Sequence, residues 1–232
     1  MLKTENLTSG YDKVMILNEI SIEIKKGEVV SIIGRNGVGK STFMKTIIGL
    51  NKTEGGQIYF DGQEIDRKKA YERAAAGMGY VPQGHGIFPQ LTVEENLKMG
   101  TMINTGSKKG EYGLVYSYFP RLEERKRQKA GTMSGGEQAM LSIGRILAGK
   151  PKILLLDEPS EGVQPNVVQQ MGEILTKIVK ELGLTVLLVE QHMGLIQQIS
   201  ERGYVMDKGR IIAELSKNDI DDPVTVKKYL TV

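Results

Sequence analysis

The sequence predicts an α/β fold in which helices pack on a parallel sheet and an antiparallel sheet lies at one side. Residues 29–33, 153–156 and 186–189 are apolar apart from Ser31, as is typical of strands buried on both faces of a parallel sheet. Between the last two strands, Pro165 can open a helix. Apolar residues follow it at helical spacing, namely Val168, Met171, Leu175, Ile178 and Leu182.

Shorter patterns predict the antiparallel strands and the remaining architecture. Residues 20–24 (ISIEI) and 57–60 (QIYF) alternate in polarity, as half-exposed strands do. Residues 203–215 are typical of a hairpin that turns at Asp207-Lys208-Gly209. Residues 84–131 are richer in Gly, Pro and charge, and we expect a largely helical insert over roughly 84–145. Residues 1–232 are expected to form a single domain.

Composition excludes several classes of protein. Hydrophobic residues make up 40% of the chain and charged residues 25%, which is ordinary for a globular protein. A formal net charge of +3 is too small to indicate a nucleic-acid or membrane surface. The chain has no cysteine, so it has no disulfide framework and no thiolate metal site, and a reducing cytoplasm is compatible. No apolar run approaches the ~18 residues of a membrane helix.

The most specific motif is GRNGVGKST, residues 34–42, which lies between an apolar strand and a helical stretch, as a phosphate-binding loop does. Gly34, Gly37 and Gly39 allow successive backbone N–H groups to face one anion, and the helix N-terminus adds positive charge. Lys40 can reach the terminal phosphates, and the Ser41 hydroxyl can ligate Mg²⁺. A merely tight turn would not require this lysine, so we expect a bound nucleoside triphosphate.

Acidic residues end the second apolar strand, in the sequence KILLLDEP (152–159). Ligands bind at the C-terminal edge of such sheets, which is where these carboxylates are expected. Asp157 is expected to hold Mg²⁺, and Glu158 to polarise an attacking water.

A third motif, TMSGGEQAML (132–141), opens another helix-like stretch. Ser134 is suited to the N-cap. Gly135 and Gly136 in a first turn each cost roughly 1 kcal/mol relative to alanine. This cost indicates that another group approaches the turn closely.

Taken together, the phosphate loop, LLLDE and SGGE resemble the ATP-binding subunits of ABC transporters over nearly the whole chain. The resemblance implies that Tyr11 stacks on adenine, Gln83 senses Mg²⁺ and the attacking water, and His192 contacts the γ-phosphate. It also identifies Ser160–Gln164 as the loop that crosses between subunits. The implied catalytic residues are Lys40, Gln83, Glu158 and His192, and the implied Mg²⁺ ligands are Ser41, Gln83 and Asp157. The residues implied to bind ATP are Tyr11, Gly34, Asn36, Gly37, Gly39, Lys40, Ser41, Thr42, Ser134, Gly135 and Gly136.

In this family two ATP-binding subunits pair head to tail, and the SGGE turn of one covers the ATP of the other. The resemblance implies that Ser134 and Gly136 donate to that γ-phosphate, and that a β-carbon at Gly135 or Gly136 would collide with it. Two positions depart from the family pattern. Glu137 stands where glutamine is commonest, a change expected to be tolerated, and Gln164 replaces an aspartate that usually hydrogen-bonds between the two sites.

A chain without a fused membrane segment resembles the separate subunits of bacterial importers. GRNGVGKST, the segment 81–97 and SEGVQP are similar to the group that imports branched-chain amino acids and urea, and are nearer the urea-type subunit. The implied cofactors are ATP and Mg²⁺. The implied partners are an identical or paralogous ATPase subunit, membrane permeases and, indirectly, an extracytoplasmic solute-binding protein, with no nucleic acid. The implied location is peripheral, at the cytoplasmic face of the inner membrane.

Other functions remain as alternatives. The ATPase of another small-solute importer would share these motifs. A non-transport ABC ATPase would show a long coiled-coil insert or two cassettes, and a phosphate-loop kinase or GTPase does not explain SGGE. Within the importer reading, we expect a membrane subunit to dock near Gly84–Asn96, with Phe88 as an exposed anchor, because aromatic residues are enriched among interface hot spots.

Overall fold

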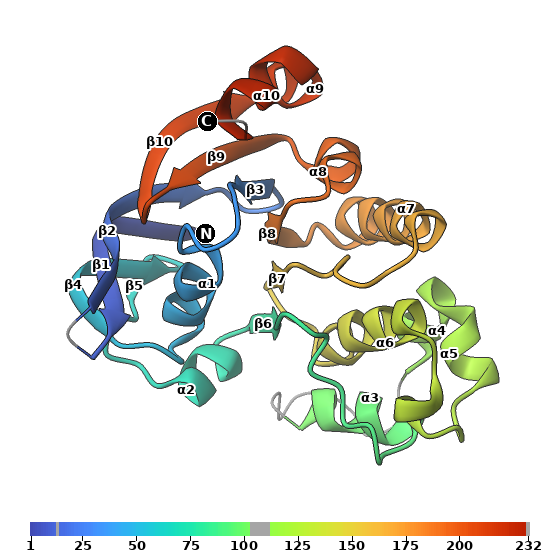
Figure 1. The fold of residues 1–232 in the computed structure, drawn as a ribbon. Helices are drawn as coiled ribbons and strands as arrows, with labels where there is room; N and C mark the ends of the chain where they lie inside the picture. The colour runs from blue at the N-terminus through green and yellow to red at the C-terminus, as the bar shows by residue number, and fades with distance from the viewer. Residues whose placement is uncertain (13, 103–111, 231–232) are drawn as a thin grey trace.

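The computed structural model describes residues 1–12, 14–102 and 112–230, and its described strands form two sheets (Figure 1). The smaller sheet is antiparallel where β1 pairs with β2 and β4, and its strand order is β2-β1-β4-β5. Both predicted antiparallel segments are confirmed, since residues 20–24 lie in β2 and 57–60 in β4. The strands are β1 (Leu2–Tyr11), β2 (Val14–Ile24), β4 (Thr53–Phe60) and β5 (Gln63–Glu64).

The larger sheet has the order β10-β9-β3-β8-β7-β6 and is parallel except for β10. The three apolar strands are confirmed as β3, β7 and β8. The predicted hairpin is also confirmed as β9 and β10, but it extends this sheet because β9 runs parallel to β3. The strands are β3 (Val29–Ile33), β6 (Met78–Val81), β7 (Ile153–Asp157), β8 (Thr185–Glu190), β9 (Arg202–Asp207) and β10 (Arg210–Ser216).

Both faces of the inner strands β3, β7 and β8 are buried, which explains the apolar runs. Alternate residues of β3 enter two different hydrophobic cores: Val29 and Ile33 face one, and Val30 and Ile32 the other. The second core lies between the two sheets and includes the buried residues of α1 (Lys40–Ile48). The first core includes residues of α6 (Gly135–Ala148) and α7 (Pro165–Leu182). Burial on both faces removes the polar half of the usual strand alternation.

The predicted helix after Pro165 is α7, and Pro165 is its first residue. Its buried residues include Val168, Met171, Leu175 and Ile178. Leu182, which we expected on the same face, is instead 42% exposed because it is the last residue of the helix. The core-facing stripe therefore ends one turn before the helix does.

The insert between β6 and β7 is helical, as predicted, and in Figure 1 its helices lie together beside the sheets. Part of the predicted insert, residues 103–111, lies outside the described residues. The described helices there are α3 (Val93–Thr101), α4 (Gly113–Tyr118), α5 (Pro120–Glu124), the 3₁₀ turn Ala130–Thr132 and α6. The other helices are α2 (Ala70–Ala75), α8 (Met193–Ile199), α9 (Lys217–Asp221) and α10 (Pro223–Leu230). Across the described ranges, no helix is both long and apolar enough to span a bilayer.

Candidate nucleotide-binding site

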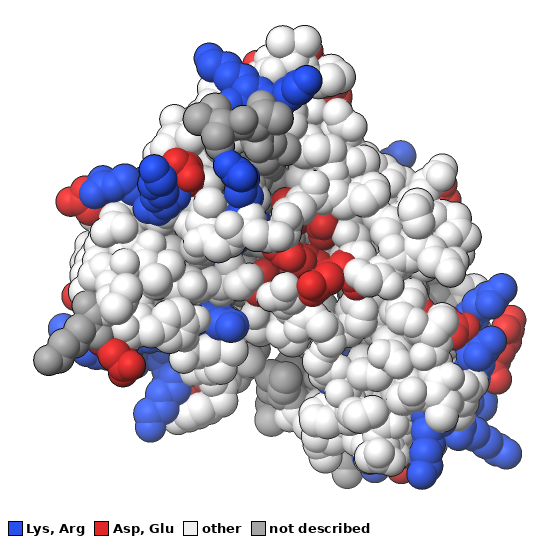
Figure 2. All heavy atoms as spheres, in the orientation of Figure 1, with Lys and Arg blue, Asp and Glu red and all other residues white. Residues whose placement is uncertain are grey.

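Functional side chains gather where the parallel strands end. The loop 34–39 follows β3, Asp157 ends β7, and Glu190 ends β8. Figure 2 shows acidic atoms near the middle of this face of the molecule, in the region where β7 and β8 lie in Figure 1. Neighbouring parallel strands bring their C-terminal residues to one edge, so segments more than 100 residues apart in sequence converge there.

The phosphate loop curls tightly before α1. Gly37 and Gly39 have φ angles of 79° and 111°, in the left-handed region that side chains disfavour. Lys40, the first residue of α1, is 4% exposed, and its Nζ donates to the carbonyl oxygens of Gly34 (2.9 Å) and Arg35 (3.0 Å). A buried ammonium thus lies across the loop, at the N-terminus of a helix whose dipole also attracts anions.

Three oxygen-bearing side chains meet beside this loop. Ser41 Oγ donates to Asp157 Oδ1 at 3.0 Å, and Tyr80 Oη donates to Asp157 Oδ2 at 3.2 Å. Asp157 is fully buried. Burial raises the pKa of its carboxyl above the usual value, although the two hydrogen bonds oppose this shift. Hydroxyl and carboxylate oxygens suit Mg²⁺, which usually takes one or two protein ligands together with phosphates and water. The described residues contain no larger cluster of ligating side chains.

Glu158 is held in an unusual backbone conformation. Its φ is 50°, in the left-handed region that non-glycine residues rarely occupy and that clusters at functional sites. The residue is 8% exposed. Its Oε1 lies 3.5 Å from Lys40 Nζ and accepts a hydrogen bond from Gln191 Nε2 at 2.8 Å. The turn after β7 therefore presents this carboxylate towards the phosphate loop.

A hollow of about 380 Å³ is lined by Lys40, Ser41 and Glu158, whereas buried Asp157 is not among its lining residues. Most predicted site residues line it, including the adenine-stacking candidate Tyr11, which is 46% exposed, and Gln83. Its lining residues are Tyr11, Ile16, Asn36, Gly37, Gly39, Lys40, Ser41, Thr42, Gln83 and Glu158. The structure thus brings the phosphate-loop, strand-end and Gln83 predictions together.

The SGGE segment lies apart from this hollow, at the start of α6. Ser134 is the N-cap, as predicted: its Oγ accepts from the Glu137 N–H, and its own N–H donates to Glu137 Oε2 at 3.0 Å. A β-carbon on Gly136 would lie 2.7 Å from Val167 Cγ1, so close packing on α7 already requires glycine there. A β-carbon on Gly135 would meet only the carbonyl oxygen of Gly162, at 3.4 Å.

Glu137 connects the same turn to the helical insert. Its Oε1 lies 3.2 Å from Arg125 Nε and 3.9 Å from Arg121 Nη1. Burial raises the pKa of Glu137, but hydrogen bonds from Ser134 and the nearby arginines outweigh burial, so the pKa lies below its ordinary value. Glu137 completes a capping box with Ser134, which is how the structure accommodates its departure from the usual glutamine.

The loop after β8 carries His192, which the family resemblance implies contacts the γ-phosphate. His192 is the N-cap of α8, and its Nδ1 accepts from the Leu195 N–H at 3.2 Å. The neighbouring Gln191 is the residue that contacts Glu158. Glu190, which was not predicted from the sequence, is 3% exposed, and its Oε1 accepts a hydrogen bond from the Ser160 hydroxyl at 2.7 Å. An acidic residue at the end of a buried strand was the signal that could have identified it.

His85 follows Gln83 in the loop after β6. Its φ is 67° and it is 8% exposed, while its Nδ1 has no hydrogen-bond partner among the described residues. Burial lowers the pKa of His85, and the charge of Glu161 opposes this shift only in part. The imidazole is therefore neutral over a wider pH range than an exposed histidine.

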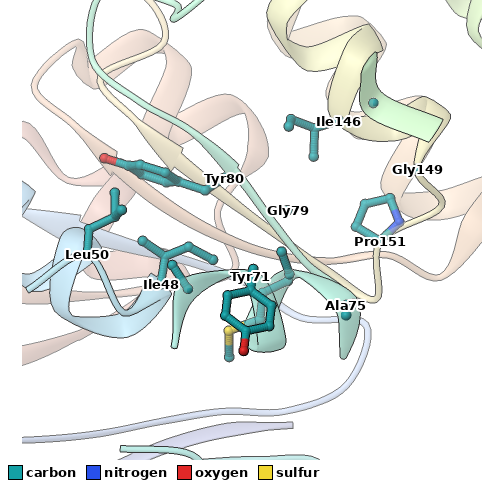
Figure 3. A pocket seen from close by; sticks show the side chains of 14 residues that line it. Ile48, Leu50, Tyr71, Ala75, Gly79, Tyr80, Ile146, Gly149 and Pro151 are labelled. Carbon is teal, nitrogen blue, oxygen red and sulfur yellow. The ribbon is translucent and has the colours of Figure 1, made fainter. Parts of the chain in front are cut away.

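A separate apolar groove lies on the other side of Tyr80 from Asp157. Figure 3 shows Ile48, Leu50 and Tyr71 facing Ile146 and Pro151 across β6. The groove has a volume of about 510 Å³, and Tyr71 and Leu50 are 68% and 59% exposed. Tyr80 lines it as well, while its hydroxyl reaches Asp157. This one side chain therefore joins the groove to the phosphate-loop site.

A phosphate loop beside strand-end carboxylates on a mainly parallel sheet defines a phosphate-loop nucleotide hydrolase. A protein-family model described as ABC transporter matches residues 17–161. The chain is 44% identical over 216 residues to the high-affinity branched-chain amino acid transport ATP-binding protein BraG of Pseudomonas aeruginosa, covering 91% of each chain. It is 35% identical to the probable branched-chain amino acid transport ATP-binding protein LivF of Archaeoglobus fulgidus, covering 95% of this chain and 94% of the relative. The chain belongs to the ABC transporter family and is an ATPase.

Solved structures confirm the predicted fold class. A nucleotide-free ATP-binding cassette of an ABC transporter matches with a TM-score of 0.86 and 30% identity, covering 99% of this chain and 98% of the other. A dimeric cassette in a post-hydrolysis state, bound to ADP and phosphate, matches with a TM-score of 0.84 and 28% identity, covering 94% and 99%. The phosphate-loop core, the antiparallel side sheet and the helical insert are those of an ABC ATPase.

Proposed function

We propose that this chain powers a solute importer by hydrolysing ATP at the hollow beside the phosphate loop. The observation that supports this most strongly is the convergence of Lys40, Ser41, Asp157 and Glu158 at one sheet edge. Lys40 and the loop N–H groups bind the β- and γ-phosphates. Ser41 and Asp157 would hold Mg²⁺, with Gln83 at the rim of the hollow. A bound Mg²⁺ would supply positive charge against the phosphates.

Glu158 is the proposed general base. Its carboxylate accepts a proton from water as the water oxygen attacks the γ-phosphorus, and ADP leaves on the far side. The contact with Lys40, whose Nζ lies 3.5 Å from Oε1, directs the carboxylate towards the phosphate loop. Burial of Glu158 makes its contacts with Lys40 and Gln191 stronger than they would be in water.

We propose that the working unit is a head-to-tail pair with an identical or paralogous subunit. Ser134 and the first turn of α6 line a different hollow from Lys40, so they are free to act on a nucleotide held by a partner. The solved dimeric relative bound to ADP and phosphate supports pairing. The N-terminus of α6, capped by Ser134, would then direct its positive end at the partner's γ-phosphate.

The proposed cargo is a branched-chain amino acid or urea. The sequence motifs favoured the urea-type subunit, whereas the relatives BraG and LivF are named for branched-chain amino acid transport, and we give the amino acids first place. Such a system would receive its solute from an extracytoplasmic binding protein and place this chain on the cytoplasmic face of the membrane. We also propose that residues 1–232 form a single domain, with the helical insert over roughly 84–145.

We propose that a membrane subunit docks in the apolar groove with a short amphipathic helix. The groove is the right chemistry for the apolar face of such a helix, and Tyr80 offers it a direct connection to Asp157. Phe88, the anchor expected from sequence, is 42% exposed, and the Arg145 guanidinium lies 5.1 Å from its ring centroid. Arg145 belongs to α6, the helix that also contributes Ile146 to the groove. The docking surface is thereby extended from residues 84–96 to the groove.

Uptake measurements in cells test the proposal. Replacing Lys40 with alanine in the chromosomal gene should abolish uptake of labelled leucine and valine, or of labelled urea, and leave an unrelated amino acid unaffected. Unchanged uptake of leucine, valine and urea would refute the proposed importer function. For docking, Tyr71→Asp should reduce uptake while the purified chain keeps its basal ATPase activity. Val224→Asp is the matched control, since Val224 is 77% exposed and lies on α10.

A further inference from the structure

The loop between β8 and α8 contributes one side chain that the recognised motifs leave out. Gln191 Nε2 donates to Glu158 Oε1 at 2.8 Å and also to Asn36 Oδ1. Glu158 follows β7, and Asn36 belongs to the phosphate loop after β3. A single amide therefore joins three separate segments of chain at the point where the proposed base faces the nucleotide.

The backbone around Gln191 is fixed by a buried carboxylate. Glu190 Oε1 accepts from the N–H groups of Gln191 and His192, both at 3.1 Å, and from the Ser160 hydroxyl at 2.7 Å. Glu190 is 3% exposed, so these contacts are shielded from water. The position of the Gln191 amide is thus set before any nucleotide binds, which is what a positioning group requires.

His192 caps the N-terminus of α8. Its Nδ1 accepts the Leu195 N–H, so one ring nitrogen is used in capping α8. Gln191 and His192 are consecutive, and of the two only Gln191 donates a hydrogen bond to the Glu158 side chain, at 2.8 Å. The geometry places Gln191 on the nucleotide side of the loop.

We propose that Gln191, rather than His192, is the positioning residue of this loop for ATP hydrolysis, an inference that rests on the proposed function. Its amide holds the Glu158 carboxylate in the orientation that accepts a proton from the attacking water, and ties that carboxylate to the phosphate loop through Asn36. A neutral amide neither gains nor loses a proton near pH 7. The Gln191 donor therefore does not change with pH, whereas a histidine there would titrate near pH ~6.5.

Steady-state ATPase assays of the purified full-length chain test this inference. Gln191→Ala should lower kcat by about tenfold to a hundredfold, the range for removing a hydrogen bond to a charged group. Its KM for ATP should stay within about twofold, because the phosphate contacts of Lys40 remain. Gln198→Ala is the matched control, since Gln198 is an exposed glutamine of α8 that donates to Gln169 O, and it should keep kcat within about twofold. His192→Ala is the comparison variant: it should lower the melting temperature, since it removes a helix cap, and should cost much less kcat than Gln191→Ala. Thermal melting and calorimetric ATP binding show that each variant is folded.

A second variant gives a readout that a structural role would not change. Gln191→His should restore part of the lost activity and add an inflection near pH ~6.5 to the pH–rate profile, which the wild type and His192→Ala lack. The inference is overturned if Gln191→Ala keeps the wild-type kcat, or if His192→Ala loses as much. Lys40→Ala, measured alongside, separates the two proposals: activity that survives Lys40→Ala contradicts the proposed function itself.

Discussion

Arg73 offers a sharp test of how the phosphate-loop helix is held. It lies on α2, is 1% exposed, and donates four hydrogen bonds to backbone carbonyls. Nη1 reaches Thr46 O and Ile47 O at 2.8 Å each, at the C-terminal end of α1. Nε and Nη2 reach Lys68 O and Asp66 O at 2.9 Å each. One guanidinium thus satisfies the end of α1 and connects it to the segment before α2.

Arg73→Met should lower the free energy of unfolding by about 3–5 kcal/mol. Hydrogen bonds from a charged donor contribute about 1.5–3 kcal/mol each, so a simple sum over four would be too large. Burial lowers the pKa of Arg73, which shows that desolvation already opposes the charged form and that removing the charge regains this cost. Four carbonyls that lose their donor account for the remaining loss.

Urea unfolding, followed by circular dichroism, measures this change. Arg67→Met is the matched control, because Arg67 is exposed and six residues away, and it should change the unfolding free energy by less than about 0.5 kcal/mol. Arg73→Lys should lose most of the stability, since an ammonium cannot reproduce the planar fork of donors. A loss below 1 kcal/mol for Arg73→Met would refute the argument that these carbonyls depend on Arg73.

Three further predictions concern residues around the site. Burial lowers the pKa of His85 in the folded chain. As the pH falls, the unfolded chain therefore takes up this proton before the folded chain does. The contribution of His85 to the unfolding free energy is present in full above about pH 6.5 and is lost as the pH falls towards the folded pKa. His85→Asn, which suits a positive φ, should flatten that decline in urea unfolding between about pH 7.5 and 5.5. Tyr80→Phe keeps the ring in the groove but removes a donor to buried Asp157, and should cost about 1–3 kcal/mol of unfolding free energy; no loss would contradict the contact. Glu137→Gln should lower the unfolding free energy by less than about 1 kcal/mol, because the amide oxygen can still accept the Ser134 N–H and the lost ion pairs are partly exposed. A larger loss, measured by thermal melting, would contradict this.

The parallel strands were predictable because burial on two faces produces a run of apolar residues. Strand β1 was not predictable, because its inward-facing residues are partly polar. Two of its inward positions are polar: Thr4 and Ser9 are 1% and 0% exposed. The Thr4 hydroxyl donates to Ile20 O, and the Ser9 hydroxyl donates to Lys52 O. These hydroxyls find partners only after the sheet forms, so the alternation that marks a strand is interrupted in the sequence.

The phosphate-loop residues and Asp157 were predictable because their chemistry is tied to local spacing. Gln191 was not, because the choice between two adjacent side chains depends on how the loop leaves β8. Glu190 fixes that path through contacts with Ser160, which lies 30 residues away in sequence. Gly136 shows the same limit: its tight contact is with Val167 on another helix, which no local pattern records.

The apolar groove also could not be predicted from local sequence patterns. Its walls come from the end of α1, from α2, from β6 and from the end of α6, and only the fold brings them together (Figure 3). Of its large apolar lining residues only Leu50 and Tyr71 are exposed, and single exposed apolar residues are unremarkable alone. Tyr71 and Ile146 lie 75 positions apart, so their pairing depends on the insertion of the helical region between β6 and β7.

The most direct test of the central claim compares binding with hydrolysis in Glu158→Gln. The amide keeps the shape of the side chain and its contact with Gln191 but cannot accept a proton. Calorimetry should therefore give an ATP affinity within a few-fold of the wild type, while phosphate release from the purified chain falls by about 10²–10⁴-fold. A Glu158→Gln variant that releases phosphate at the wild-type rate would contradict the account, because the proton of the attacking water would then be accepted elsewhere.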